Sequence, residues 1–243
     1  MGNVTNTSQD EWSVFNNVAG LATLKEATTA TSYEIRPALI SANRFGALIC
    51  SPFHVGVFGF GVFHFGDEIY SEQLLSLGYA NSIGNTSLGL RVSYIQYHAE
   101  GFGTHGILGF DFGGITKLTK QIFIGAWIQN LNQPKLNINN HEKAPVKLYA
   151  SVGFTPTQKF ILITEVEKDI LYPAIWKSGL QYSVAKKFFI RVGFNINPNA
   201  FYSGVGFQTW RIKMDYSYQG FSLPGVSHQA SASYRISKFK SKE

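Results

Sequence analysis

The chain has 243 residues, a length that suits one large all-β domain or two smaller domains. Charged residues are 15% of the chain and aromatic residues also 15%, so it lacks the roughly 25% charge that is typical of soluble globular proteins. The net charge is +6, but the basic residues occur singly along the chain, and we therefore expect no nucleic-acid partner. No stretch approaches the roughly 20 consecutive apolar residues of a spanning helix, which argues against a helical membrane protein.

Residues 1–28 differ from the rest of the chain. They are polar and rich in Asn, Thr and Ser, and the run Leu21–Glu26 predicts a short helical turn. The first residues are polar rather than basic and then apolar, so no secretory signal is visible. If the protein is exported, the numbering describes a mature form without its signal peptide.

From about residue 30 onward, strand-like runs of roughly eight to twelve residues recur between turn signals. The predicted strands are 30–37, 41–50, 55–65, 68–80, 86–98, 104–115, 121–131, 144–155, 159–168, 172–184, 187–196, 199–209, 210–218 and 226–237. The intervening turns are short, for example Ser51-Pro52 and Gly66-Asp67, so neighbours in sequence are expected to be neighbours in space. A basic tail, residues 237–243, is expected to be solvated.

Apolar and polar residues alternate along the later strands. In residues 188–196, Phe188, Ile190 and Val192 alternate with Phe189, Arg191 and Gly193. This period of two predicts strands with one oily face and one wet face.

Fourteen strands paired in order leave two open edges unless the sheet closes, and a barrel removes those edges. Tilted strands of this length match the hydrocarbon thickness of a bilayer, and an even strand number is typical of outer-membrane barrels. The sequence therefore predicts an all-β fold: a transmembrane antiparallel up-and-down barrel of about 14 strands. A soluble β-sandwich or a lipocalin-like barrel is the alternative.

The wet face carries charges of both signs, which we expect to line the lumen and to pair across it, since they would be costly against lipid. These predicted lumen charges are Arg91, Asp111, Lys147, Glu165, Glu167, Lys177, Arg191, Arg211, Lys213, Asp215 and Arg235.

Signals of catalysis are weak. The six histidines lack zinc-site spacing, the single Cys50 lies in an apolar stretch, and Ser227 and His228 are adjacent and so face opposite ways. Glu165 and Glu167 share a face and could act as paired carboxylates, but an ion pair with Lys147 or Lys177 is the favoured reading. We expect no enzyme activity, no cofactor and no metal site.

Residues 12–22, with the sequence WSVFNNVAGLA, resemble the N-terminal signature of FadL-like outer-membrane barrels and their PorV/PorQ relatives in Bacteroidota. Asn17, Ala19, Gly20 and Leu21 match the motif, whereas Val18 stands where proline is usual. Residues 124–131 are similar to a recurrent strand of the same relatives. The resemblance implies a fourteen-stranded barrel in the bacterial outer membrane, residues 29–243, with residues 1–28 folded inside it as a plug.

Two functions are open at this point. The favoured one, from family resemblance and economical loops, is an accessory or structural subunit of a larger outer-membrane complex, in protein secretion, export or assembly as in PorV-like relatives. The alternative is a FadL-like transporter of hydrophobic small molecules. The expected partners are accordingly outer-membrane lipid, other outer-membrane proteins and, for the transporter, hydrophobic ligands.

Overall fold

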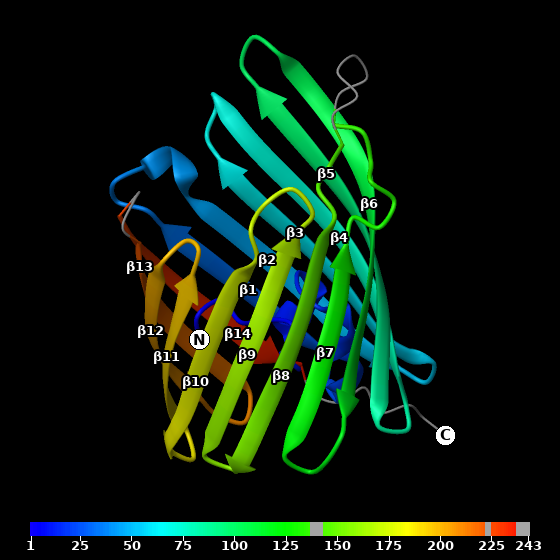
Figure 1. Ribbon diagram of the computed structural model, residues 1–243, viewed down its shortest axis with the longest axis vertical. Helices are drawn as coiled ribbons and strands as arrows, with labels where there is room; N and C mark the ends of the chain where they lie inside the picture. The colour runs from blue at the N-terminus through cyan, green and yellow to red at the C-terminus, as the bar shows by residue number, and fades with distance from the viewer. Residues whose placement is uncertain (137–142, 222–224, 237–243) are drawn as a thin grey trace.

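A computed structural model describes residues 1–136, 143–221 and 225–236 of the chain. The described residues form a closed barrel of fourteen antiparallel strands in which each strand pairs with its neighbours in sequence and β1 pairs with β14 (Figure 1). The strands are β1 (Thr28–Ile35), β2 (Arg44–Phe53), β3 (Gly56–Gly66), β4 (Tyr70–Ile83), β5 (Thr86–Ala99), β6 (Gly103–Lys117), β7 (Ile122–Gln129), β8 (Lys147–Thr157), β9 (Phe160–Asp169), β10 (Ile175–Ala185), β11 (Phe188–Ile196), β12 (Ala200–Gln208), β13 (Ile212–Phe221) and β14 (Val226–Arg235).

The predicted barrel is confirmed, and each predicted strand overlaps one observed strand. The largest shifts occur at loops. A short 3-10 helix, η3 (Ile40–Ala42), occupies the expected start of β2. Strand β7 ends at Gln129 because Asn130 has a left-handed backbone with φ of 56°, which turns the chain out of the sheet. The expected solvated tail, residues 237–243, lies outside the described residues.

The two ends of the barrel differ. At the lower end in Figure 1, the described connections are turns of two to four residues, such as 54–55, 84–85 and 118–121. The connection between β1 and β2 and the one between β7 and β8 are longer and lie at the opposite end, where β4, β5 and β6 rise above the other strands. We refer to these as the short-turn end and the long-loop end.

The outer face of the barrel is apolar. Alternate residues point outward along each strand, and the outward set includes Leu77, Leu90 and Val205, whose exposed fractions are 57%, 58% and 54%. The charged residue Arg191, which alternates with apolar neighbours on β11, points inward. This arrangement places an oily band where lipid would lie and polar groups in the lumen.

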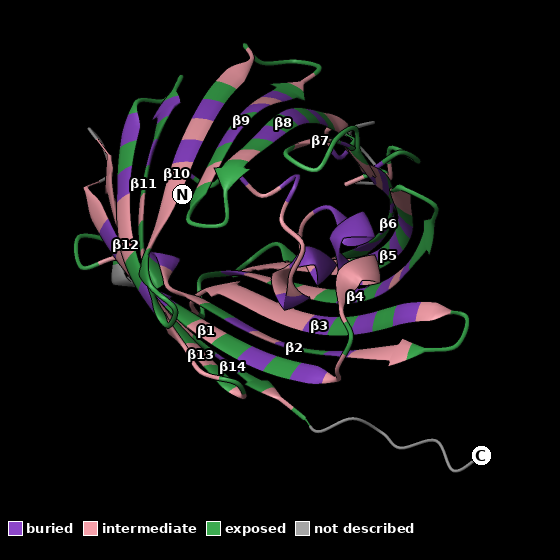
Figure 2. Cartoon of the chain, turned by 90° about the horizontal axis from the view of Figure 1, so that it is seen from below, coloured by how far each residue is buried: buried purple, intermediate pink, exposed green. Residues whose placement is uncertain are grey.

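Residues 1–27, which precede β1 and are called the luminal segment here, lie inside the barrel (Figure 2). They contain two 3-10 helices, η1 (Glu11–Val14) and η2 (Val18–Thr23). The expected helical turn at Leu21–Glu26 thus forms three residues earlier, because the Asn17 side chain caps η2 by accepting a hydrogen bond from the Ala19 amide at 3.2 Å. Thr28, expected as the last residue of the plug, is the first residue of β1.

The luminal segment forms the apolar core together with one wall of the barrel. Val14, Val18 and Leu21 are fully buried against Leu48, Cys50, Val57 and Ala80 of β2 to β4. Glycines of β3 and β4 make room for them: a Cβ added at Gly59 would lie 2.9 Å from Leu21, and one at Gly78 would lie 2.8 Å from Val18. Gly59 and Gly78 therefore accommodate side chains of the luminal segment.

No helix among the described residues is long and apolar enough to cross a membrane.

Candidate functional site

Two asparagines hold the luminal segment together at the centre of the lumen. The Asn17 side-chain nitrogen donates to the Asn6 carbonyl at 2.8 Å and to the Asn6 side-chain oxygen at 2.9 Å. Asn6 in turn donates to the Gly125 carbonyl of β7 at 2.9 Å and to the Ser151 hydroxyl of β8 at 2.7 Å. Both asparagines are fully buried, so this network satisfies polar groups that would otherwise be costly.

The other residues of the motif, Ala19, Gly20 and Leu21, are also tightly packed. Ala19 and Leu21 have no exposed surface, and Gly20 is buried. A Cβ at Gly20 would lie 2.1 Å from the Ser8 carbonyl oxygen and 2.3 Å from the Ser13 hydroxyl. Only glycine fits where these two parts of the luminal segment cross.

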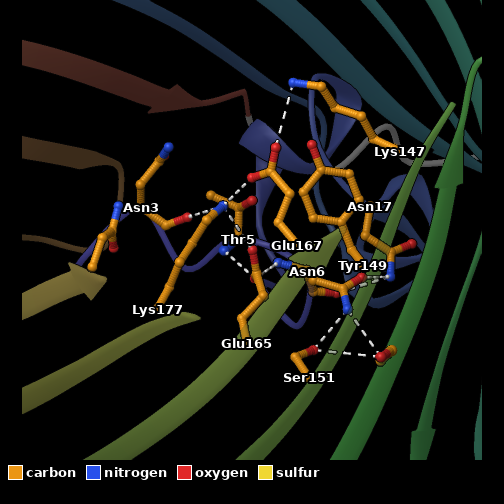
Figure 3. Close-up of polar contacts among 12 residues, drawn as sticks. Asn3, Thr5, Asn6, Asn17, Lys147, Tyr149, Ser151, Glu165, Glu167 and Lys177 are labelled. Atoms are coloured by element: carbon orange, nitrogen blue, oxygen red, sulfur yellow. Dashed lines mark hydrogen bonds and ion pairs between the residues drawn. The ribbon is translucent and has the colours of Figure 1, made fainter. Parts of the chain in front are cut away.

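Glu165 of β9 binds the first residues of the luminal segment (Figure 3). Its Oε2 atom accepts hydrogen bonds from the amides of Thr5 and Asn6, both at 2.9 Å. Its Oε1 atom accepts one from the Lys177 ammonium at 3.1 Å. The Glu165 side chain is completely buried, so these three donors replace its hydration.

Lys177 joins Glu165 to a second carboxylate. It sits opposite Glu165 in the β9–β10 register, and its Nζ atom lies 2.7 Å from Glu167 Oε2. Lys147 of β8 lies 3.4 Å from the other oxygen of Glu167 and is about one-third exposed (Figure 3). The structure therefore brings four of the predicted lumen charges into one chain of ion pairs.

Arg91 and Asp111 form a second buried ion pair, between β5 and β6. Arg91 also donates to the Val14 carbonyl at 3.1 Å, and its guanidinium lies 5.2 Å from the centroid of the Trp127 ring. Asp111 accepts from the Asn130 amide at 2.7 Å. This pair fixes η1 to the wall, and Trp127 stacks on Tyr149, whose ring lies 5.4 Å from the Lys177 ammonium.

A third group of charges lies toward the short-turn end. Lys213 of β13 is 3.8 Å from Asp10 and 3.9 Å from Glu11, and Ser233 donates to Glu11. Asp10 caps η1 by accepting a hydrogen bond from the Trp12 amide at 3.1 Å, so these contacts tie the start of η1 to β13 and β14.

The remaining predicted lumen charges divide into two sets. Arg191 pairs with Asp215 and donates to the Gln181 side chain at 2.6 Å, inside the barrel. Arg211 lies elsewhere: it precedes β13, stacks at 4.0 Å over the Trp210 ring and donates to Tyr234 at 3.1 Å. Arg235 ends β14 and makes no ion pair with any described residue.

The luminal segment leaves open space on both sides of itself. A cavity of about 870 Å³ opens toward the short-turn end, where Lys117, Thr119 and Gln208 lie. A cavity of about 610 Å³ opens toward the long-loop end, lined by Arg36, Arg44 and other residues. The lumen is therefore two vestibules separated by a partition.

The residues considered for catalysis or metal binding lie apart or are held by structural contacts. No group of three or more His, Cys, Asp or Glu side chains suited to a metal ion occurs among the described residues. Glu165 and Glu167 are held by lysines and amides, so neither is free as a paired acid and base. Ser227 faces inward, whereas His228 bonds Tyr216 on the outward side.

Some luminal residues carried no signal in the sequence. Asn6 lies eleven residues before Asn17 in a polar stretch, and nothing in the spacing marked the pair. Trp12 was visible as part of the motif but without a role. Its position inside the lumen becomes apparent only when η1 is placed between the cavities.

Solved structures with the same fold include outer-membrane channels. The CymD monoaromatic hydrocarbon channel matches with a TM-score of 0.67 and 10% identity over 96% of this chain and 94% of that chain. The Pseudomonas putida toluene transporter TodX has a TM-score of 0.64 and 11% identity over 96% and 95% of the two chains. A Pseudomonas aeruginosa FadL homologue has a TM-score of 0.60 and 12% identity over 98% and 96%.

At these identities the likeness establishes the fold alone, a closed antiparallel β-barrel. No protein-family model matches the chain, and no curated protein matches it.

Proposed function

We propose that this protein is a non-enzymatic channel of the bacterial outer membrane that admits small molecules, with the luminal segment, residues 1–27, acting as a plug. The observation that carries the proposal is the pair of vestibules, of about 870 and 610 Å³, on either side of the luminal segment. A barrel with only a structural role has no need of open space at both ends of its lumen. The fold shared with CymD, TodX and the FadL homologue supports the same reading.

The orientation follows from the loops. Outer-membrane barrels have short periplasmic turns and longer extracellular loops. We therefore assign the short-turn end to the periplasm and the long-loop end to the outside. In this orientation the larger vestibule opens to the periplasm.

Small hydrophobic or amphipathic molecules are the proposed cargo. Apolar side chains line the larger vestibule together with polar and charged ones such as Gln181, Lys213 and Ser231. The apolar set is Val4, Trp12, Phe123, Ile161, Ile163 and Phe189. Concave sites that combine apolar side chains with polar groups are typical of small-molecule binding. TodX is named as a transporter of toluene and CymD as a channel for monoaromatic hydrocarbons, in line with this class.

The accessory-subunit reading, which the sequence favoured, receives less support. The structural neighbours named above are channels or transporters, and the described residues offer no feature that singles out a protein partner from lipid along the apolar outer face. Kinship with PorV and PorQ proteins and an origin in Bacteroidota rest on the sequence resemblance of residues 12–22 and 124–131.

Reconstitution tests the channel. The purified protein in planar lipid bilayers is expected to carry a small ionic current, and Glu165→Gln should increase it because the first residues of the plug lose their anchor. Lys147→Gln, which removes a partly exposed partner of Glu167, is the matched control and should leave the current near that of the wild type. Bilayers that stay silent with all three proteins would contradict the proposal, and recovery of a stable hetero-complex in mild detergent would favour the subunit instead.

A further inference from the structure

The two vestibules approach each other along one wall of the barrel. Four residues line both cavities: Met1 and Trp12 of the luminal segment, Ser217 of β13 and Gln229 of β14. Ser217 and Gln229 are directly opposite each other in the β13–β14 register. The partition between the vestibules is therefore thin at this point.

Glycine contacts reveal which walls the luminal segment touches. Added Cβ atoms at Gly89 of β5 and Gly125 of β7 would lie 2.7 Å from Ala19 and 2.9 Å from Asn6. At Gly193 of β11, a Cβ would lie 2.2 Å from the Gly2 amide nitrogen. The luminal segment is thus pressed against these strands with no room for even a methyl group.

The glycines of β12 behave differently. The atoms nearest to a Cβ at Gly204 belong to Tyr216 and Ser217, and those nearest to a Cβ at Gly206 belong to Asp215, Phe189 and Arg191. All of these nearest neighbours belong to the barrel wall. The lumen is consequently open beside β12, whereas Lys213 of β13 and Ser233 of β14 contact Asp10 and Glu11 of the luminal segment.

The open wall presents hydrogen-bonding groups that are not already engaged. The side chains of Ser217, Gln229 and Ser231 make no hydrogen bond to any described residue. The neighbouring positions Gly204 and Gly206 have no side chain to narrow the space. Opposite this polar strip, Trp12 supplies one large aromatic surface from the luminal segment.

We infer that solutes cross the partition between Trp12 and the polar strip of Ser217, Gln229 and Ser231. The luminal segment meanwhile stays anchored to the other walls and, beside the strip, to Lys213 and Ser233. The solutes that this route selects are small amphipathic molecules with an apolar face for the indole and hydroxyl or amide groups for the strip. A pure hydrocarbon would remove water from these polar groups without replacing its hydrogen bonds. This inference rests on the proposed channel function and specifies its route and its cargo.

Cysteine labelling tests the route in the full-length protein. A charged methanethiosulfonate reagent added to Ser217→Cys should cause a severalfold loss of single-channel conductance, because the modified side chain narrows the passage. Ser203→Cys is the matched control, since Ser203 belongs to β12 but lies on its outward face. The wild type gives the baseline, since Cys50 has no exposed surface.

Substitution of the aromatic partner tests the same point from the luminal side. Trp12→Ala should raise the conductance severalfold, whereas Val18→Ala, which loosens the luminal segment on its packed side, should not. Equal increases in both variants would mean that any loosening opens the lumen, and would overturn the assigned route.

Current block tests the cargo. 4-Nitrophenyl glucoside, which has an aromatic face and hydroxyl groups, should block the wild-type current at concentrations where glucose does not, and Trp12→Ala should abolish this difference. Equal block by both solutes would overturn the amphipathic class. If modification of Ser217→Cys leaves the current unchanged, the route is wrong but the channel function still holds. If no variant carries a current, both the route and the channel function are wrong.

Discussion

Glu165, on strand β9 of the barrel wall, binds the luminal segment through its carboxylate. It is fully buried, and it accepts hydrogen bonds from the backbone amides of residues 5 and 6 and from the Lys177 ammonium. A buried charge of this kind holds its partners firmly, because any partner that leaves exposes an uncompensated ion to a poor solvent. Thr5 and Asn6 are therefore held by this side chain in addition to the Asn6–Asn17 network.

Replacing that carboxylate should release those residues. Glu165→Gln keeps the shape but removes the charge, and we expect a loss of about 3 kcal/mol or more from breaking a buried ion pair. Amide hydrogen exchange at Thr5 and Asn6 should accelerate accordingly. Lys147→Gln breaks an ion pair with a partly exposed partner and should cost less than about 1 kcal/mol. Unchanged exchange in Glu165→Gln would show that Asn6 and Asn17 suffice as the anchor.

At the level of elements, the fit between the luminal segment and the strands depends on glycine. Strands β3 to β7 carry inward glycines where Leu21, Phe15, Val18, Asn17 and Asn6 come close. These strands alternate less cleanly in sequence because their inner face is apolar or empty rather than polar. The pairing register is continuous from β2 to β6. The register shifts that the described strands contain lie between β8 and β9 and between β10 and β11.

A methyl group added at Gly89 of β5 should therefore push η2 away from that strand. Gly89→Ala would place a Cβ 2.7 Å from the Ala19 nitrogen and 2.8 Å from the Val18 carbonyl carbon, which are backbone atoms of η2. We expect a destabilisation of about 1–3 kcal/mol, typical of overpacking, in urea unfolding from lipid vesicles. Gly220→Ala in β13, where the nearest atom would be 3.4 Å away, is the control and should be close to neutral. Equal stability of the two variants would mean that η2 moves without cost.

For the whole molecule, the direction in which the apolar side chains point distinguishes a membrane barrel from a soluble sandwich. The outward residues of the strands are apolar, and the ion pairs of Arg91, Lys177 and Arg191 are inside. A soluble sandwich would have the opposite arrangement, since its apolar side chains would meet between two sheets. The closed pairing of β1 with β14 leaves no sheet edge that lipid would have to cover.

The depth of the apolar band can be measured with a charge. Leu90 points outward near the middle of β5, and Leu90→Arg is expected to cost about 2–4 kcal/mol at the bilayer midplane. Val184 points outward next to the turn that follows β10, and Val184→Arg should cost about 0–1 kcal/mol near the interface. Unfolding from lipid vesicles gives both values, and a small cost at Leu90 would argue that this surface does not face lipid.

The alternation of residue types was sufficient to predict the barrel from the sequence. In residues 188–196, for instance, each step along the chain reverses the side-chain direction, so the composition of the two faces can be read without coordinates. The turn residues then separated the strands, and short turns implied pairing in order. The same rule placed Glu165 and Lys177 on the inner face.

What the alternation could not supply was the identity of the partners across the lumen. Arg211 follows the inward pattern, yet it lies over Trp210 beside Tyr234 because it belongs to a turn, where strand geometry no longer applies. Asn6, Trp12 and Gln229 gained their roles only from the path of the luminal segment through the barrel. Strand periodicity is a local property that each short stretch carries, whereas the partition and its open side arise from contacts between residues more than a hundred positions apart, which only the closed tertiary structure decides.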